Sequence, residues 1–201
     1  MRRTLEALTI WILSSVAAAA QAPSAATYIT AEEVKTVNSQ PGVDRTIRVV
    51  DIGGEHFAVG VIHRVAGGSG RGFAPTSEPC GVRSSTPPAD GTPGGITHDG
   101  QTEGYLILSG GGTLVTGGHL VNGWRHPATS DVTKILNGPS CSGTIAGPDV
   151  VKRELKTGDI VIIPAGVPHA WTDVTDHVDY LSFRPSGRLL EAGYVHPSIR
   201  K

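Results

Sequence analysis

Glycine and proline interrupt this chain more often than any helical architecture tolerates. They occupy 27 and 14 of the 201 positions, and together they fill about a fifth of the sequence. Glycine weakens a helix and proline breaks one, so this high content of glycine and proline argues against a helical bundle and predicts many short strands joined by turns. The length fits a single domain of ordinary size.

The net charge of the chain bears on whether it could bind nucleic acid. The chain has 17 basic and 18 acidic residues and a formal net charge of −1, so no basic excess exists to bind a phosphate backbone. Nucleic acid is therefore not an expected partner. The hydrophobic content of 38% and the low net charge are typical of a folded rather than a disordered chain.

The first twenty residues have the layout of a secretory signal peptide. A basic start, Met1 to Arg3, precedes an apolar run over 7–20, and small residues close it. Cleavage after Ala20 is favoured, because cleavage after Ala22 would leave Pro23 at the new terminus. The alternative is an uncleaved membrane anchor, but the apolar run is shorter than the roughly 20 residues that a spanning helix needs. The prediction is a secreted or periplasmic protein without membrane association after cleavage.

The two cysteines, Cys80 and Cys141, agree with export. An even number of cysteines in an exported chain favours a disulfide, and this one would close a loop of about 60 residues. Two free thiols and a thiolate metal pair are the alternatives. The latter is weakly supported, because neither cysteine has a second cysteine or histidine nearby in the sequence.

Secondary structure is predicted from caps and alternation. Thr30 and Glu33 have capping-box spacing, so a short helix is expected to run to about Val37, within an N-terminal helix and linker over 21–44. Alternating apolar residues predict strands beyond it. The sequence Ser109-Gly110-Gly111-Gly112 predicts a hairpin turn. The expected strands cover 45–50, 56–65, 105–108, 113–116, 151–155, 159–163, 169–174 and 178–183.

Two long segments, 66–97 and 117–150, read as loop insertions rich in Gly, Pro, Ser and Thr. Each carries one cysteine, so a disulfide would join them, and both are expected to start or finish near one end of the strands, where they could form a lid. The C-terminal tail, 186–201, is expected to begin with a helical turn at 188–192.

Two spaced motifs carry chemistry. In the first, His98 is followed by Glu103 and, after six intervening residues, by Gly110. The second runs from Gly158 through Pro164-Ala165-Gly166 to His169. Over 45–185 the chain thereby resembles the cupin superfamily. The resemblance implies an all-β, antiparallel jelly-roll barrel, here with a short N-terminal helix and two long loop insertions.

The resemblance also implies a metal site. Carried over residue by residue, the ligands are His98, Glu103 and His169, whereas Ile96 stands where cupins usually place a first histidine. Imidazole and carboxylate suit one divalent transition metal, Fe, Mn, Zn, Cu or Ni, and two His with one carboxylate is the set used by non-haem iron oxygenases. The alternative is a metal-free barrel with hydrogen-bonded histidines.

Four further residues are candidates for the site. His63 is expected to face inward; it could replace the missing ligand, act as a base or simply be structural. Tyr105 shares the parity of Glu103 and is the other candidate for proton transfer. Trp171 shares the parity of His169 and is expected to shape the pocket, as is Gln101 in the loop beside the ligands.

These features predict an exported metal-binding cupin that acts on a small oxygenated substrate. The chemistry within the range of the family is oxidative cleavage, decarboxylation, lyase or isomerase action on a small-molecule or sugar-derived substrate. The competing hypothesis is a non-catalytic barrel that binds a small molecule or sugar. A homodimer is implied by the resemblance alone.

Overall fold

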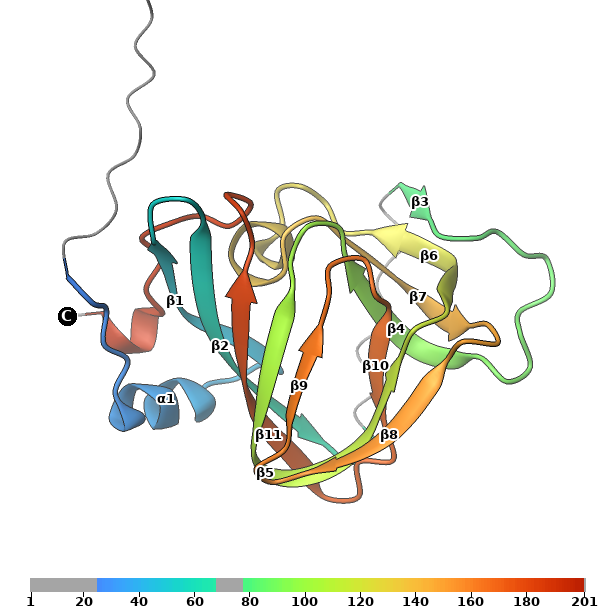
Figure 1. The fold of residues 1–201 in the computed structure, drawn as a ribbon, viewed down its shortest axis with the longest axis horizontal. Coiled ribbons are helices and arrows are strands. Elements are labelled where there is room, and N and C mark those ends of the chain that lie inside the picture. Colours follow the sequence, from blue (N-terminus) through green and yellow to red (C-terminus); the bar gives the residue numbers. More distant parts are fainter. Residues whose placement is uncertain (1–24, 68–77, 201) are drawn as a thin grey trace, which may run out of the picture.

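The computed structural model describes residues 25–67 and 78–200 (Figure 1). No helix in that part of the chain is long and apolar enough to cross a membrane. The expected signal peptide over 1–20 lies outside the described residues. The elements in order are α1 (Ala31–Asn38), β1 (Asp44–Asp51), β2 (His56–Val65), β3 (Pro79–Cys80), β4 (Thr92–His98), β5 (Glu103–Thr116), β6 (His119–Arg125), the π-helix η1 (Val132–Leu136), β7 (Ser140–Ala146), β8 (Val151–Lys156), β9 (Ile160–Ile163), β10 (His169–Thr172), β11 (His177–Pro185) and the 3-10 helix η2 (Pro197–Ile199).

The strands form one antiparallel sheet that rolls into an open barrel (Figure 1). Its order is β1-β2-β11-β5-β10-β4-β7-β6-β3, and β8 and β9 each pair with β5. The front wall consists of β1, β2, β11, β5 and β9, and the back wall of β8, β5, β10, β4, β7, β6 and β3. The all-β fold expected from the sequence is confirmed.

Strand β5 passes through both walls, so the prediction of a hairpin at 109–112 is wrong. Its first half pairs with β9 and β11, and its second half pairs with β8 and β10. The glycines mark close backbone approach instead of a turn. A Cβ on Gly110 would lie 1.9 Å from the His177 carbonyl oxygen, and one on Gly111 would lie 2.5 Å from that of Leu155.

The barrel interior is lined by alternate residues of strands from both walls. Tyr105 and Ile107 of β5 share the inward face of Glu103 and pack with Ile62 and Tyr180. Leu114, Leu155, Ile163 and Val178 complete this buried cluster. The predicted parity of Glu103 and Tyr105 is therefore confirmed, and it places the carboxylate at one end of an otherwise apolar and aromatic interior.

Helix α1 covers the outer side of the front wall. The capping box between Thr30 and Glu33 is present, and Val37 packs on Ile47 and Val61. Alternation in β2 therefore grouped Val61 and His63 on one face as predicted, but that face points toward α1. The prediction that His63 faces into the barrel is wrong, because the helix and not the barrel buries this side of the strand.

The two insertions contain more regular structure than the loops expected from the sequence. The first holds β3 and β4, and the second folds as β6 and β7 with η1 between them. The predicted disulfide joins Cys80 of β3 to Cys141 of β7. The predicted helical turn at 188–192 is not helical, and the tail instead forms η2 at Pro197–Ile199.

Candidate metal centre

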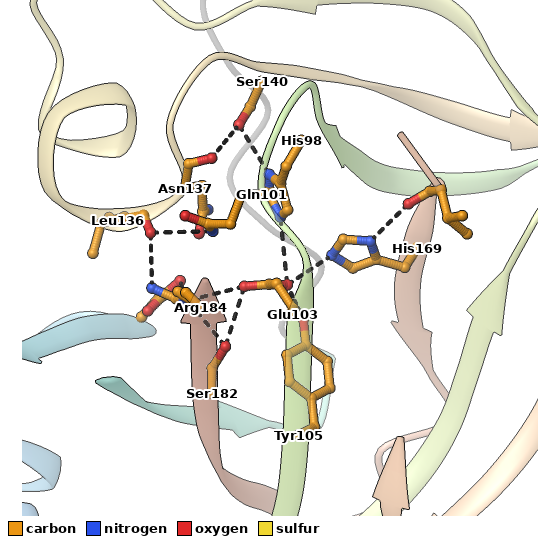
Figure 2. Close-up of polar contacts among 12 residues, drawn as sticks. His98, Gln101, Glu103, Tyr105, Leu136, Asn137, Ser140, His169, Ser182 and Arg184 are labelled. Atoms are coloured by element: carbon orange, nitrogen blue, oxygen red, sulfur yellow. Dashed lines mark hydrogen bonds and ion pairs between the residues drawn. The ribbon is translucent and has the colours of Figure 1, made fainter. Parts of the chain in front are cut away.

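Three strand ends bring the candidate ligands together (Figure 2). His98 ends β4, Glu103 begins β5 and His169 begins β10. The Nε2 atoms of His98 and His169 lie 3.4 and 3.2 Å from Glu103 Oε2. All three side chains are buried. Within residues 25–67 and 78–200, this is the one group of three or more His, Cys, Asp or Glu side chains close enough to share a metal ion.

Hydrogen bonds on the far side of each ring determine where the ring protons sit. His169 Nδ1 is 3.1 Å from the Val167 carbonyl, which can only accept, so Nδ1 carries the proton. Ser140 Oγ lies 2.8 Å from the Gly138 carbonyl and gives its single proton there. Ser140 Oγ must then accept from His98 Nδ1, 2.9 Å away. A neutral imidazole has one ring proton, so both Nε2 atoms present lone pairs.

Three electron-pair donors thus face one another: two Nε2 lone pairs and the carboxylate oxygen of Glu103. Such an arrangement requires a cation or an added proton between the donors. Burial lowers the pKa of His98 despite the attraction of Glu103, which disfavours the extra proton on that ring. The donor set and its geometry therefore fit a transition-metal ion.

The other carboxylate oxygen of Glu103 is held by two residues of β11. Arg184 Nε donates to Oε1 at 2.9 Å, and Ser182 Oγ donates to it at 3.2 Å. Burial opposes ionisation of Glu103, but its interactions with neighbouring groups, including the permanently charged Arg184, outweigh it and hold the pKa of this carboxyl well below its ordinary value. Oε1 is thus occupied by protein donors, and Oε2 is the oxygen presented to the histidines.

Tyr105 donates its hydroxyl proton to Glu103 Oε2 at 2.5 Å. Burial, together with the charge of Glu103, raises the pKa of Tyr105 well above its ordinary value. Tyr105 therefore keeps its proton at neutral pH. It lies at the site as predicted, but as a hydrogen-bond donor to Glu103 rather than a ready base.

Most of the remaining candidates lie away from the three ligands. His63 Nδ1 is 2.6 Å from Asp179 Oδ1, in an outer cluster with His177 whose ring is stacked at 6.1 Å. Ile96 pairs with His169 across β4 and β10 and offers no donor atom. Trp171 lies deeper in the barrel against Tyr180, with ring centroids 5.4 Å apart.

The second insertion supplies a backbone support for the centre that sequence reasoning missed. The carbonyl of Leu136, the last residue of η1, accepts from Arg184 Nη1 at 3.1 Å and from Gln101 Nε2 at 3.4 Å (Figure 2). Gln101 is buried beside the ligands and is anchored to η1. Neither Arg184 nor Ser140 stands in a recognisable motif, so no signal in the sequence could have found them; short π-helices do often occur at functional sites.

Ser140 provides a direct test of the hydrogen bonds that position the candidate ligands. Replacing Ser140 with Ala leaves His98 Nδ1 without its acceptor, so we expect metal affinity to fall about 10–100-fold with the fold retained. Ser142 is the matched control, because it lies on the same strand and its Oγ is 2.9 Å from Nε2 of His126, which is not among the candidate ligands. Calorimetric metal titration of both variants measures the effect. Equal affinity in Ser140→Ala and Ser142→Ala contradicts the role of Ser140.

Comparison with known proteins returns structural likenesses only. No family model and no curated protein sequence matches the chain. A double-stranded β-helix protein from Klebsiella pneumoniae is 15% identical with a TM-score of 0.40, covering 82% of this chain and 94% of its own. A cupin protein from Bacteroides fragilis is 17% identical with a TM-score of 0.33, covering 72% and 78%. Oxalate oxidase in complex with glycolate is 16% identical with a TM-score of 0.36, covering 75% and 55%.

The two sequence motifs meet at one end of the barrel. His98 and Glu103 of the first motif flank the turn between β4 and β5, and His169 of the second motif begins β10 beside them. Gly158 and Gly166 of the second motif both have positive φ, which explains two of its fixed glycines. The antiparallel open barrel and the meeting of both motifs inside it are the features that the resemblance to the cupin superfamily implies.

Proposed function

We propose that this protein binds one divalent transition metal through His98, Glu103 and His169 and acts on a small oxygenated substrate. The observation that carries the proposal is the meeting of the Nε2 atoms of two buried histidines with the carboxylate of buried Glu103. A metal ion bound there would supply Lewis acidity toward oxygen atoms of the substrate. Protein export to a secreted or periplasmic location is part of the proposal and is supported by the disulfide.

The chain's own residues would prepare the site in three ways. Arg184 orients Glu103 through Oε1 and keeps it ionised. Ser140 and the Val167 carbonyl fix the tautomers of the histidines. Tyr105 holds its proton at Glu103 Oε2, and the aromatic cluster behind it excludes water from that side of the site. Such preorganisation is what a metal-assisted reaction requires of its protein.

Metal analysis tests the proposal. Protein purified from its export compartment is expected to contain close to one transition-metal ion, and the chelator-treated protein is expected to take up one of Fe, Mn, Zn, Cu or Ni. Changing His169 to Ala should lower the affinity by at least about 100-fold, beyond the range for outer hydrogen-bond partners. The control is His119→Ala, an exposed histidine on β6.

Two results would overturn the proposal: stoichiometric metal in His169→Ala, or no uptake of any of these ions by the wild-type protein. The second result, combined with saturable sugar binding, would favour the non-catalytic barrel. Oxygen uptake by iron- or copper-loaded protein would indicate an oxidase or oxygenase. Zinc or manganese without oxygen uptake would indicate a lyase or isomerase.

A further inference from the structure

A separate cleft of about 360 Å³ opens beside Trp171, within the size range of small-molecule sites. Its walls come from the end of β2, the start of β4 and the turn after β10. The lining residues are Arg64, Val65, Gly67, Pro93, Trp171, Thr172, Asp173 and Val174. None of the candidate metal ligands lines it, so its chemistry has to be considered by itself.

Arg64 is the unusual group in this cleft. Its side chain is half-buried, and its Nε donates to the Tyr180 hydroxyl at 3.2 Å. No ion pair joins Arg64 to a carboxylate anywhere in residues 25–67 and 78–200, whereas Arg184 has two and Arg48 has one. The sequence 68–77 contains no Asp or Glu. A half-buried cation with no carboxylate bound to it would attract an anion that enters the cleft.

Trp171 adds a hydrogen-bond donor to the Arg64 charge. Its Nε1 is buried and has no acceptor among the described residues. The indole ring and the side chains of Val65, Pro93 and Val174 supply apolar surface around the two donors. A cation without a carboxylate partner, set beside apolar walls, matches a ligand with one carboxylate and an apolar body.

We propose that this cleft binds a small organic monocarboxylate, with the carboxylate at Arg64 and the apolar part against Trp171. Asp173 is the other charged group of the cleft; it is exposed at the rim, where its Oδ2 accepts from Thr172 Oγ1 at 3.0 Å. A carboxylate at the rim repels a second negative charge, which favours a monoanion over a dianion. The site goes beyond the proposed metal chemistry and requires no metal, because Tyr180 and Tyr105 lie between Arg64 and Glu103.

The test uses phenylacetate as the probe and phenylacetamide as its neutral counterpart. Titration of isotope-labelled full-length protein follows the indole N–H resonance of Trp171, identified by its loss in Trp171→Phe. We expect saturable shifts with phenylacetate and none with phenylacetamide, in both chelator-treated and metal-loaded protein. Calorimetry gives the affinities of the variants.

Arg64→Met should weaken phenylacetate binding at least about 10-fold, the loss of a charge-assisted hydrogen bond. Trp171→Phe should weaken phenylacetate binding by a few-fold. The affinity of Arg64→Lys should lie between those of Arg64→Met and the wild type, because lysine keeps the charge but loses the paired N–H donors of the guanidinium. The matched control is Arg153→Met, since Arg153 is exposed on β8. If Arg64→Met does not fold, Arg64→Lys and Trp171→Phe decide the question.

Three outcomes would overturn the proposal. The first is equal binding of phenylacetamide, and the second is no shift up to about 10 mM phenylacetate, a concentration at which even a weak site would fill. The third is binding that needs bound metal and is unchanged in the Arg64 variants, which would place the carboxylate on the metal. Failure of metal uptake alone leaves the expected result unchanged, so the two proposals fail separately.

Discussion

Replacing Arg184 with Met is expected to lower the free energy of unfolding by about 3–5 kcal/mol in the metal-free protein. Arg184 is 1% exposed and binds two carboxylates, Glu103 Oε1 at 2.9 Å and Asp44 Oδ2 at 2.7 Å. Methionine fills a similar volume but leaves both acids without their counter-charge, and Glu103 is buried where water cannot replace it. Urea unfolding at neutral pH with a chelator present measures the loss.

Metal should partly reverse this loss. If a divalent cation binds at Glu103, it supplies the positive charge that the variant lacks, so Arg184→Met should gain more stability from metal than the wild type does. Arg153→Met is the control and is expected to change stability by less than about 0.5 kcal/mol, because Arg153 is exposed on β8. A loss below about 1 kcal/mol in Arg184→Met would show that the buried ion-pair network contributes little.

Reduction of the Cys80–Cys141 bridge is expected to cost about 4 kcal/mol of stability, from the entropy of the closed loop in the unfolded chain. The bridged residues are separated by 61 positions. Inside the fold, β3 is only two residues long and pairs only with β6, so the bridge is its main attachment to β7. The segment after β3 should therefore loosen before the barrel strands.

Limited trypsin digestion checks this order of events. Cleavage after Arg83, which follows β3 and is exposed, should accelerate on reduction, whereas cleavage after Arg153 on β8 should not. The double variant Cys80→Ala with Cys141→Ala should behave as the reduced protein does. Two alkylatable thiols in exported protein, or equal unfolding midpoints with and without reductant, would contradict the stabilising role of the bridge.

Sequence reasoning predicted the features that short segments of the chain determine by themselves. Alternation delimited β2 as His56–Val65, and the capping box located the start of α1. Motif spacing selected His98, Glu103 and His169, because strand ends in an antiparallel barrel bring distant segments to one place. Each of these inferences depends on backbone periodicity or fixed spacing, which short segments encode by themselves.

Sequence reasoning failed where the role of a residue depends on contacts with segments that are distant in the sequence. The pattern of β2 could not show that α1 covers the face of His63, because that depends on where a helix elsewhere in the chain packs. The glycine run in β5 looks the same whether it turns or admits close neighbours. The sequence around Arg184 is that of an ordinary strand, and only the fold shows that Arg184 forms ion pairs with Glu103 and Asp44.

The passage of β5 through both walls restricts how this protein can evolve. Glu103, Tyr105 and Ile107 point inward because they alternate along a single strand. Deleting one residue between them would turn the carboxylate to the outside and empty part of the apolar interior in the same step. This stretch can change its side chains gradually but cannot change its length. Insertions and deletions are therefore expected in connections such as 126–131 and 147–150, where no candidate ligand depends on the strand register.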